Sequence, residues 1–286
     1  MSKTLSDLIQ SSKIGSQMSE EIFEEIAGIS KKDIFLQKDE FIVSKVIERR
    51  YLEIEKKILA GVPLQYALSY ANFFGMRFSV TEGVLIPRPE TEVMVSKAIK
   101  LINSRSSLNK KSCEKLRVVD IGTGSGCIAI SLAAEIEEIK NKDFEIKIFA
   151  SDISPDALLV AKNNAKLHHA KIHFILSDLL ENQDLPESFD LVLANLPYLR
   201  PDYLENNISL KYEPDIALNG GANGLVIIDR LIDTLKTKLN DNGIAILEID
   251  PGQAEAIAEK LKTKSLSFSF IKDLNSRTRF VQIENN

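Results

Sequence analysis

The stretch that decides the fold is VVDIGTGSGCIAISLAA, residues Val118–Ala134. Its start predicts a short apolar strand, its glycine-rich middle predicts a turn, and its end predicts a helix. A strand that enters a helix through glycines brings backbone amides close to a ligand that side chains would otherwise keep away. The sequence therefore places a small-molecule site at this turn.

The spacing of the glycines indicates which ligand the turn suits. A dinucleotide-binding turn would have its third glycine at position 127, where this chain has Cys127. The G-x-G-x-G form is thus a poor match to a pyrophosphate loop. It fits S-adenosylmethionine, which carries no phosphate and needs room for its methionine and ribose portions. The residues expected to hold this donor are Gly122, Thr123, Gly124, Ser125 and Gly126.

Two further apolar runs end in acidic residues that suit the same ligand. One run ends at Asp152, whose carboxylate can accept both ribose hydroxyls at the carboxyl end of a strand. The next run is followed by Asp178 and Leu179, which we expect to flank the adenine, the first through its amino group and the second by apolar contact. Asp156 follows Asp152 closely, but it stands in the first turn of a helix, where an acidic residue complements the helix dipole.

Another apolar strand, 189–194, is followed by the tetrad Asn-Leu-Pro-Tyr. An amide or aromatic amine is a poor nucleophile because its lone pair is delocalised, so an enzyme must hold both N–H groups and aim the nitrogen. The side-chain oxygen of Asn195 and the backbone carbonyl of Leu196 can accept those two hydrogens. Tyr198 offers a flat face, and Pro197 keeps the turn rigid. The tetrad favours methylation of a planar nitrogen, although Asn and Pro are also ordinary turn formers.

The spacing of hydrophobic residues predicts that the chain has a helical part, a β-hairpin and an α/β part. Residues 1–70 show helical periodicity, and a β-hairpin is expected over 73–86 with its turn near Glu82-Gly83. From Pro89 onward strands alternate with helices, which predicts an α/β fold with a mostly parallel sheet, helices on both faces and an antiparallel hairpin over 265–283 at one edge. The main stripe of the helical part consists of Ile42, Val46, Ile47, Tyr51, Ile54 and Ile58.

Composition and charge narrow the class of protein. The 286 residues are 44% hydrophobic, enough for about two domains, and the net charge is −5, whereas nucleic-acid enzymes tend to present a basic surface. Cys113 and Cys127 are too few for a disulfide scaffold, and no His or Cys spacing predicts a metal site. No apolar run reaches the roughly 18 residues of a membrane span, and the chain does not begin with a signal peptide. We therefore expect a cytoplasmic protein.

Three segments carry a resemblance to a known family: Ile-Pro-Arg-Pro-Glu-Thr-Glu at 86–92, the glycine turn with its flanks at 120–129, and the tetrad at 195–198. They resemble the protein-glutamine N5-methyltransferases that modify peptide chain release factors, and the similarity spans nearly the whole chain. It implies a Rossmann-like S-adenosylmethionine-dependent methyltransferase domain at 89–286, joined by a hairpin linker at 71–88 to a small helical domain at 1–70.

The resemblance also implies a substrate and a set of binding residues. The implied substrate is the glutamine of a Gly-Gly-Gln tripeptide in a release factor, held by Asn195, Leu196, Pro197 and Tyr198, without direct contact to nucleic acid or membrane. The implied donor is S-adenosylmethionine, held by the glycine turn, Asp152 and Leu179. The resemblance adds this substrate to the site that the residues themselves indicate.

The sequence departs from the family pattern at three positions. Leu196 stands where the family usually has a second proline, Leu179 stands where some relatives carry an aromatic residue, and Asp250 stands where glycine is more usual. The backbone carbonyl at 196 is kept, so we expect the chemistry to survive. Three charged residues, Arg88, Glu90 and Glu92, are expected just before the first helix of the catalytic domain. A structural ion-pair and capping set and a set of substrate contacts are both open interpretations of them.

Two alternative functions remain open from the sequence. Asn-Leu-Pro-Tyr is also how the motif reads in the ribosomal-RNA adenine N6-dimethylases, but those enzymes have their extra helices after the catalytic domain, whereas here a helical part precedes it. The second alternative is a donor-binding regulatory protein that has lost catalysis. Leu196 is its only support.

Overall fold

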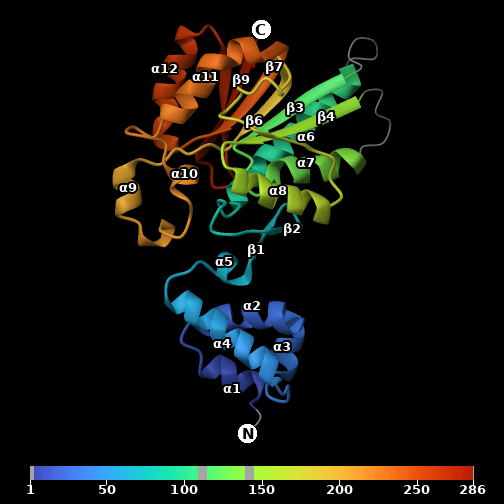
Figure 1. Cartoon of the computed structure of the whole chain (residues 1–286), viewed down its shortest axis with the longest axis vertical. Coiled ribbons are helices and arrows are strands. Elements are labelled where there is room, and N and C mark those ends of the chain that lie inside the picture. The colour runs from blue at the N-terminus through green and yellow to red at the C-terminus, as the bar shows by residue number, and fades with distance from the viewer. Residues whose placement is uncertain (1–2, 109–114, 139–144, 286) are drawn as a thin grey trace. The chain divides into compact units, whose positions relative to one another are not determined.

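The structure is a computed structural model, and it describes residues 3–108, 115–138 and 145–285. The chain divides into two compact units, Met1–Ser69 and Tyr70–Asn286 (Figure 1). Cys113 lies outside the described residues, and Cys127 is buried. None of the helices in the described part of the chain combines the length and the apolar composition needed to cross a membrane.

The first unit is helical and has its own apolar core. At the centre of this core the rings of Phe23 and Tyr51 stack with their centroids 4.4 Å apart. The Tyr51 hydroxyl lies 2.9 Å from that of Ser19, so the buried polar atoms are paired. The helices are α1 (Leu5–Gln10), α2 (Ser16–Ala27), α3 (Lys31–Gln37), α4 (Lys45–Leu59) and α5 (Leu64–Leu68).

The predicted stripe of this unit is only partly correct. Tyr51 and Ile54 are buried in the core, but Ile42 and Val46 are 57% and 78% exposed. Ile42 precedes the helix, because α4 begins only at Lys45. Val46 is five positions before Tyr51, which at 3.6 residues per turn is about 140° around the helix. It therefore faces away from the core.

A β-hairpin opens the second unit, but the predicted position of its turn is wrong. β1 (Tyr70–Phe73) and β2 (Met76–Ser79) pair antiparallel, so the turn is Phe74-Gly75 instead of Glu82-Gly83. Both turn residues have positive φ, 52° and 71°, as a two-residue hairpin turn of type I′ requires. The backbone N–H of Phe74 donates to Glu92 Oε1 at 2.8 Å. Since an aromatic residue rarely adopts positive φ, the composition did not reveal this turn.

The main sheet of the second unit has the order β5-β4-β3-β6-β7-β9-β8 in the described residues. The first five of these strands run parallel, and β9 runs antiparallel to both β7 and β8. The predicted α/β fold with an antiparallel hairpin at one edge is confirmed. The strands are β3 (Lys115–Ile121), β4 (Glu145–Asp152), β5 (His173–Leu176), β6 (Phe189–Ala194), β7 (Leu239–Glu248), β8 (Ser267–Lys272) and β9 (Thr278–Asn285).

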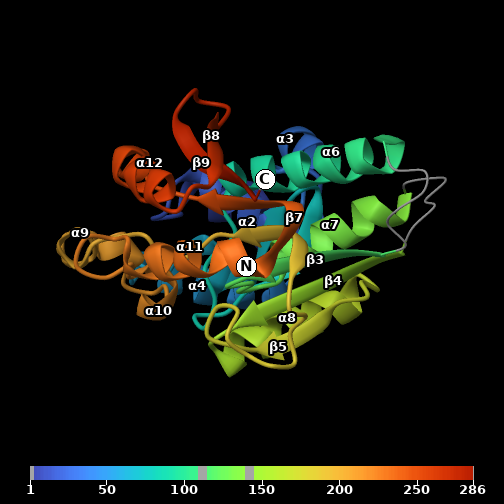
Figure 2. The same ribbon diagram turned by 90° about the horizontal axis from the view of Figure 1, so that it is seen from above.

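Helices cover both faces of this sheet (Figure 2). Because side chains alternate along a strand, Val118 of β3 packs with α6 and α7, whereas Val119 packs with α11 and α12. The longer helices are α6 (Glu92–Leu108), α7 (Cys127–Glu138), α8 (Pro155–Leu167), α11 (Val226–Lys238) and α12 (Ala254–Thr263). The short helical segments are η1 (Pro89–Thr91), α9 (Pro201–Glu205), η2 (Ile208–Leu210), α10 (Asp215–Leu218) and η3 (Pro251–Gln253).

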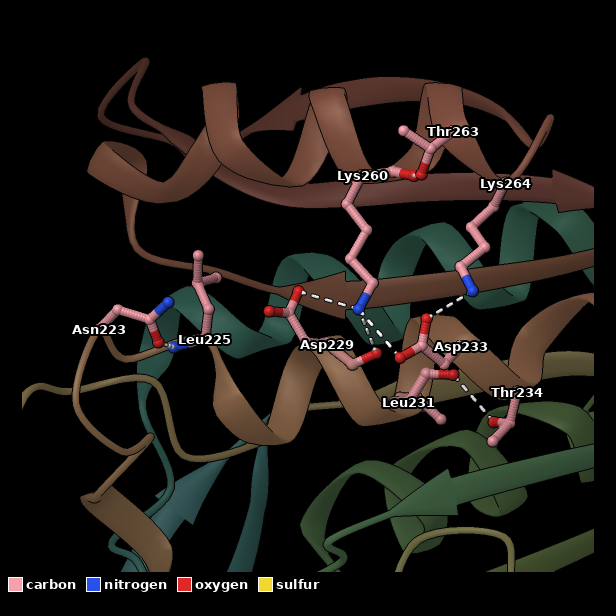
Figure 3. A network of polar contacts seen from close by, with 9 residues as sticks. All are labelled: Asn223, Leu225, Asp229, Leu231, Asp233, Thr234, Lys260, Thr263 and Lys264. Carbon is pink, nitrogen blue, oxygen red and sulfur yellow. Dashed lines mark hydrogen bonds and ion pairs between the residues drawn. The ribbon is translucent and has the colours of Figure 1, made fainter.

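Charged side chains join α11 to the end of α12 (Figure 3). Lys260 Nζ donates to the backbone oxygen of Asp229 at 2.9 Å and to Asp233 Oδ2 at 3.1 Å, and Lys264 Nζ lies 2.7 Å from Asp233 Oδ1. Hydrogen bonds from Lys264 and Lys260 lower the pKa of Asp233. Since exposed ion pairs contribute only about 0–1 kcal/mol each, this network aligns the two helices more than it stabilises the fold.

The strand order brings distant parts of the sequence to one edge. β3 lies between β4 and β6, where the order of the chain across the sheet reverses, and ligands bind at such a point in open α/β sheets. In the register Ala194 is beside both Ile121 and Leu247. The glycine turn, the tetrad and Glu248 therefore follow neighbouring strand positions.

Candidate active site

Two cavities meet at the tetrad. The first, which we call the loop cavity, has a volume of about 360 Å³ and is lined by Gly122, Gly124 and Asp152 among others. The second, which we call the arginine cavity, has a volume of about 680 Å³ and is lined by four arginines. Both sizes fall in the range of small-molecule sites. The residues that line both cavities are Leu85, Asn195, Leu196 and Ala217.

The glycine turn faces the loop cavity with only some of its residues. Gly122 and Gly124 line the cavity, whereas Thr123, Ser125 and Gly126 do not. The Thr123 hydroxyl donates inward to Asp120 Oδ2 at 2.6 Å, and Ser125 is buried. A Cβ on Gly126 would come within 3.2 Å of that of Ala161 on α8, so this glycine permits close packing.

Asp152 is the carboxylate of the loop cavity. Its Oδ2 accepts the backbone N–H of Gly124 and its Oδ1 accepts that of Ser154, both at 2.9 Å. Burial raises the pKa of Asp152, and these two hydrogen bonds act in the opposite direction. Each carboxylate oxygen can accept a further hydrogen bond, so the same group can shape the glycine turn and receive ligand hydroxyls.

Asp178 and Leu179 also line the loop cavity. Their contact with an adenine stays a prediction. Asp178 Oδ2 accepts from Arg230 Nη2 at 2.8 Å, and the same nitrogen lies 3.0 Å from Glu181 Oε1. Because each carboxylate oxygen can accept more than one hydrogen bond, Asp178 can still receive a ligand amino group. Leu179 has a positive φ of 51° and is buried. Arg230 comes from α11, and no local pattern in the sequence pointed to it.

The tetrad divides its residues between the two cavities. Asn195 Nδ2 donates to Thr91 Oγ1 at 3.1 Å, which leaves Oδ1 as the amide atom for a ligand. Pro197 lines the loop cavity and Tyr198 lines the arginine cavity. The Tyr198 hydroxyl donates to Glu248 Oε1 at 3.4 Å. Burial, and after it the charge of Glu248, raises the pKa of Tyr198.

Leu196, the departure from the family pattern, has a packing role. Its side chain is buried in the core shared by β3, β6 and α11. A Cβ on Gly122 would come within 3.1 Å of Leu196 Cδ2, so the leucine packs over the glycine turn. Packing thus fixes the tetrad at a position where the usual proline would fix φ.

A glycine-rich loop and Gln253 hold the backbone of the tetrad. A Cβ on Gly220 would come within 2.7 Å of Tyr198 Cα, and one on Gly224 within 2.4 Å of the Tyr198 carbonyl oxygen, so only glycine fits at these positions. Gln253 Nε2 donates to the carbonyl oxygens of Tyr198 and Gly224, both at 3.0 Å. No local pattern in the sequence points to Gln253, because its partners are distant in sequence.

Asp250, for which the sequence offered no explanation, forms a helix cap. Its Oδ1 accepts the backbone N–H of Gly252 at 2.8 Å, while Gln253 Oε1 accepts the backbone N–H of Asp250 at 3.1 Å. This reciprocal capping box starts η3. It also orients the Gln253 amide whose nitrogen holds the tetrad.

Replacing Asp250 with alanine is expected to lower the free energy of unfolding by about 0.5–2 kcal/mol, the usual effect of losing such a cap. Urea unfolding followed by circular dichroism measures it. Asp241→Ala is the matched control, because Asp241 is an exposed aspartate of the preceding strand. Equal unfolding midpoints for the two variants would show that the cap contributes nothing.

Two charged residues at the start of α6 and just before it, Glu92 and Arg88, have structural partners. Arg88 forms an ion pair with Glu213, whose other oxygen accepts the backbone N–H of Ile86 at 3.2 Å. Glu92 holds the hairpin turn, as described above. The ion pair supports the structural interpretation of Arg88, and because Arg88 also lines the arginine cavity, its contact with a substrate stays a prediction. The arginines of this cavity are Arg88, Arg200, Arg277 and Arg279.

Among the described residues, no three His, Cys, Asp or Glu side chains gather as metal ligands would. The site is thus built from backbone amides, carboxylates, the Asn195 amide and aromatic and apolar walls. Such an arrangement can bind a nucleoside in the loop cavity and present a planar group to it from the arginine cavity.

Comparisons with known proteins show similarity to methyltransferases. Residues 112–271 match a family described as a methyltransferase domain. A protein of Lactococcus lactis named release factor glutamine methyltransferase is 37% identical, with 81% of each chain covered. A protein of Deinococcus radiodurans with the same name is 31% identical, with 91% of this chain and 88% of that protein covered.

Among solved structures, the catalytic domain of hMettl16 in complex with the MAT2A 3′UTR hairpin 6 is similar in fold. It has a TM-score of 0.54 and 16% identity, and the match covers 84% of this chain and 81% of that one. At this identity the likeness concerns the fold alone.

Proposed function

Since this chain belongs to the release factor glutamine methyltransferase family, we propose that it methylates the side-chain amide nitrogen, N5, of the glutamine in the Gly-Gly-Gln motif of peptide chain release factors. The methyl donor in this proposal is S-adenosylmethionine. Release factors act on the ribosome, so the reaction would take place in the cytoplasm.

The observation that carries the proposal is the position of Asn195 and Leu196 in the wall of both cavities. A donor in the loop cavity and a glutamine side chain entering from the arginine cavity would meet at these two residues. Both directly follow β6, the central strand of the sheet in the described residues. Well-oriented reactants gain roughly 7–11 kcal/mol from proximity alone, so this arrangement supplies a large part of the catalysis.

The residues of the loop cavity fit the donor. Gly122 and Gly124 both line the cavity, open space lies where a Cβ on Gly124 would be, and the Asp152 carboxylate can accept the ribose hydroxyls. Asp178 and Leu179 would contact the adenine. S-adenosylmethionine supplies a methyl group on a positively charged sulfur, which the amide nitrogen can take in one displacement.

On the substrate side, the tetrad holds and aims the amide. Asn195 Oδ1 and the carbonyl of Leu196 would each accept one N–H of the glutamine, which polarises the nitrogen and fixes its direction. Tyr198 would give the planar group a flat wall, while its hydroxyl is held by Glu248. The nitrogen becomes strongly acidic once it carries the methyl group, so its proton can leave to water and no general base is required.

Labelling separates this function from its main alternative. The protein is incubated with donor labelled in the methyl group and either a release factor or immature ribosomal RNA. We expect label in the glutamine of the Gly-Gly-Gln motif and none in a release factor whose motif glutamine is replaced by alanine. Label in adenine would instead support a ribosomal-RNA methyltransferase, which the names of the relatives do not favour. Measurable turnover would exclude a purely regulatory protein.

The helical part of the chain is proposed to recognise the release factor. In the first unit, Phe35 and Leu36 on α3 are 78% and 63% exposed, and Val46 on α4 is also exposed. Exposed apolar side chains of this kind are typical of protein–protein contacts. The division into 1–70, 71–88 and 89–286, with recognition in the first part, stays a prediction.

A further inference from the structure

Glu248 is a buried carboxylate beside the tetrad. It is the last residue of β7, it is only 2% exposed, and it follows Leu247, which is paired with Ala194 in the sheet. Its Oε2 accepts the hydroxyl hydrogen of Thr91 at 2.6 Å. Burying an ionised carboxylate costs folding free energy unless hydrogen-bond donors compensate for the lost water. The position of Glu248 therefore calls for an explanation.

The hydroxyl of Thr91 links Glu248 to Asn195. A hydroxyl has one hydrogen to donate, and in this structure Thr91 gives it to Glu248. Its oxygen can then only accept, and it accepts from Asn195 Nδ2 at 3.1 Å. The chain of hydrogen bonds therefore has a direction, from Asn195 through Thr91 to Glu248.

We propose that Glu248 is a positioning residue that, through Thr91, fixes the Asn195 amide with its oxygen toward the amide of the substrate. The inference rests on the proposed function and adds the residues that orient its central side chain. An ionised carboxylate can only accept, so it forces Thr91 to donate to it. A neutral carboxyl group can donate to Thr91, which can then donate to the Asn195 amide oxygen and withdraw it from the substrate.

The direction of the hydrogen bonds from Asn195 through Thr91 to Glu248 depends on whether Glu248 is ionised. Burial raises the pKa of Glu248 to about 7, while the Thr91 hydrogen bond, the charge of Arg279 on β9 and the Tyr198 hydrogen bond lower it, and the charge of Glu90 on η1 raises it. The charge of Arg88 acts to lower the pKa of Tyr198, the residue whose hydroxyl donates to Glu248. The ionised form becomes dominant as pH rises through about 7, so kcat should rise with pH over this range.

A second buried carboxylate must be separated from this effect. Burial raises the pKa of Asp120 to about 7 as well, but Asp120 accepts from Thr123 beneath the glycine turn. Its titration would change the binding of the donor. The pH profile is therefore measured as kcat at saturating donor and substrate, with donor affinity determined by calorimetry at each pH.

Two substitutions of Thr91 test the link. Thr91→Val keeps the shape and removes the hydroxyl, and it is expected to lower kcat roughly 10- to 100-fold with little change in donor affinity. Thr91→Ser keeps the hydroxyl and is expected to retain most of the wild-type kcat. Equal, wild-type kcat for both variants would overturn the proposal, and so would an equal loss in both.

Substitution of Glu248 tests the direction. Glu248→Gln keeps the shape but does not ionise, and its amide can donate to Thr91. We expect a lower kcat that no longer changes with pH around 7, whereas Glu255→Gln, an exposed control on α12, should keep the wild-type profile. A wild-type profile in Glu248→Gln would contradict the inference. If this variant does not fold, the Thr91 pair decides.

The wild-type protein is assayed first with a release factor. Absence of label in the motif glutamine contradicts the proposed function itself. With wild-type turnover established, the behaviour of the Thr91 and Glu248 variants bears on the positioning role alone.

Discussion

Replacing Asn195 with alanine is expected to lower kcat for glutamine methylation about 100- to 1,000-fold, the usual effect of removing one preorganised contact to the reacting group. Asn195 Oδ1 is the atom that the hydrogen bond to Thr91 leaves for the substrate, and no neighbouring side chain of the tetrad replaces it. The measurement is transfer of labelled methyl to a release factor under saturating conditions.

Donor binding distinguishes a catalytic loss from a collapsed site. Asn195 lines the loop cavity, but the glycine turn and Asp152 are held by other contacts, so the affinity for S-adenosylmethionine should change little. Asn206→Ala is a matched control, because Asn206 is exposed at the end of α9. Full turnover by Asn195→Ala would refute the role assigned to the tetrad.

Replacing Asp152 with alanine is expected to weaken donor binding about 100-fold or more, because two charge-assisted hydrogen bonds to the ribose are lost. The substitution also removes the acceptor for the backbone N–H groups of Gly124 and Ser154, so the glycine turn loses its support. Isothermal titration calorimetry with S-adenosylmethionine measures the loss directly.

Asp156→Ala is the control for this prediction, since Asp156 is an exposed carboxylate in the first turn of α8. It should bind the donor like the wild-type protein. Asp152→Asn adds a second comparison, because it keeps the shape of the side chain and removes its charge. Wild-type affinity in Asp152→Ala would mean that the loop cavity is not the donor site.

The sequence alone predicted the parts of the protein that depend on neighbouring residues. The run from Val118 to Ala134 contains a strand, a turn and a helix, because side-chain alternation, glycine and helical spacing act over a few residues. The same holds for the tetrad after β6 and for Asp152 at the end of β4. The carboxyl ends of parallel strands lie at one edge of a sheet, so the sequence already predicted that these residues lie close together.

Local sequence patterns did not predict features that depend on contacts with residues distant in the sequence. The hairpin turn at Phe74-Gly75 is stabilised by Glu92, eighteen positions along the chain, and an aromatic residue with positive φ has no local signal. Likewise, the sequence shows Leu196 only as a departure from the family's usual proline, whereas the structure shows that it packs over Gly122. The role of Asp250 as a helix cap depends on Gln253, whose side-chain amide also donates to the backbone of the tetrad.

What the sequence by itself determined is which residues are expected to carry the chemistry: a glycine turn proposed to hold the donor, a carboxylate proposed to hold its ribose, and a tetrad that can hold a planar nitrogen. What only the tertiary structure decided is how that tetrad is oriented. Thr91 is 104 positions from Asn195 and 157 positions from Glu248, and the three meet because β6 and β7 are neighbours in the sheet and η1 lies beside their ends. Periodicity acts over a few residues, whereas hydrogen bonds between distant segments exist only once strand order and register have been fixed.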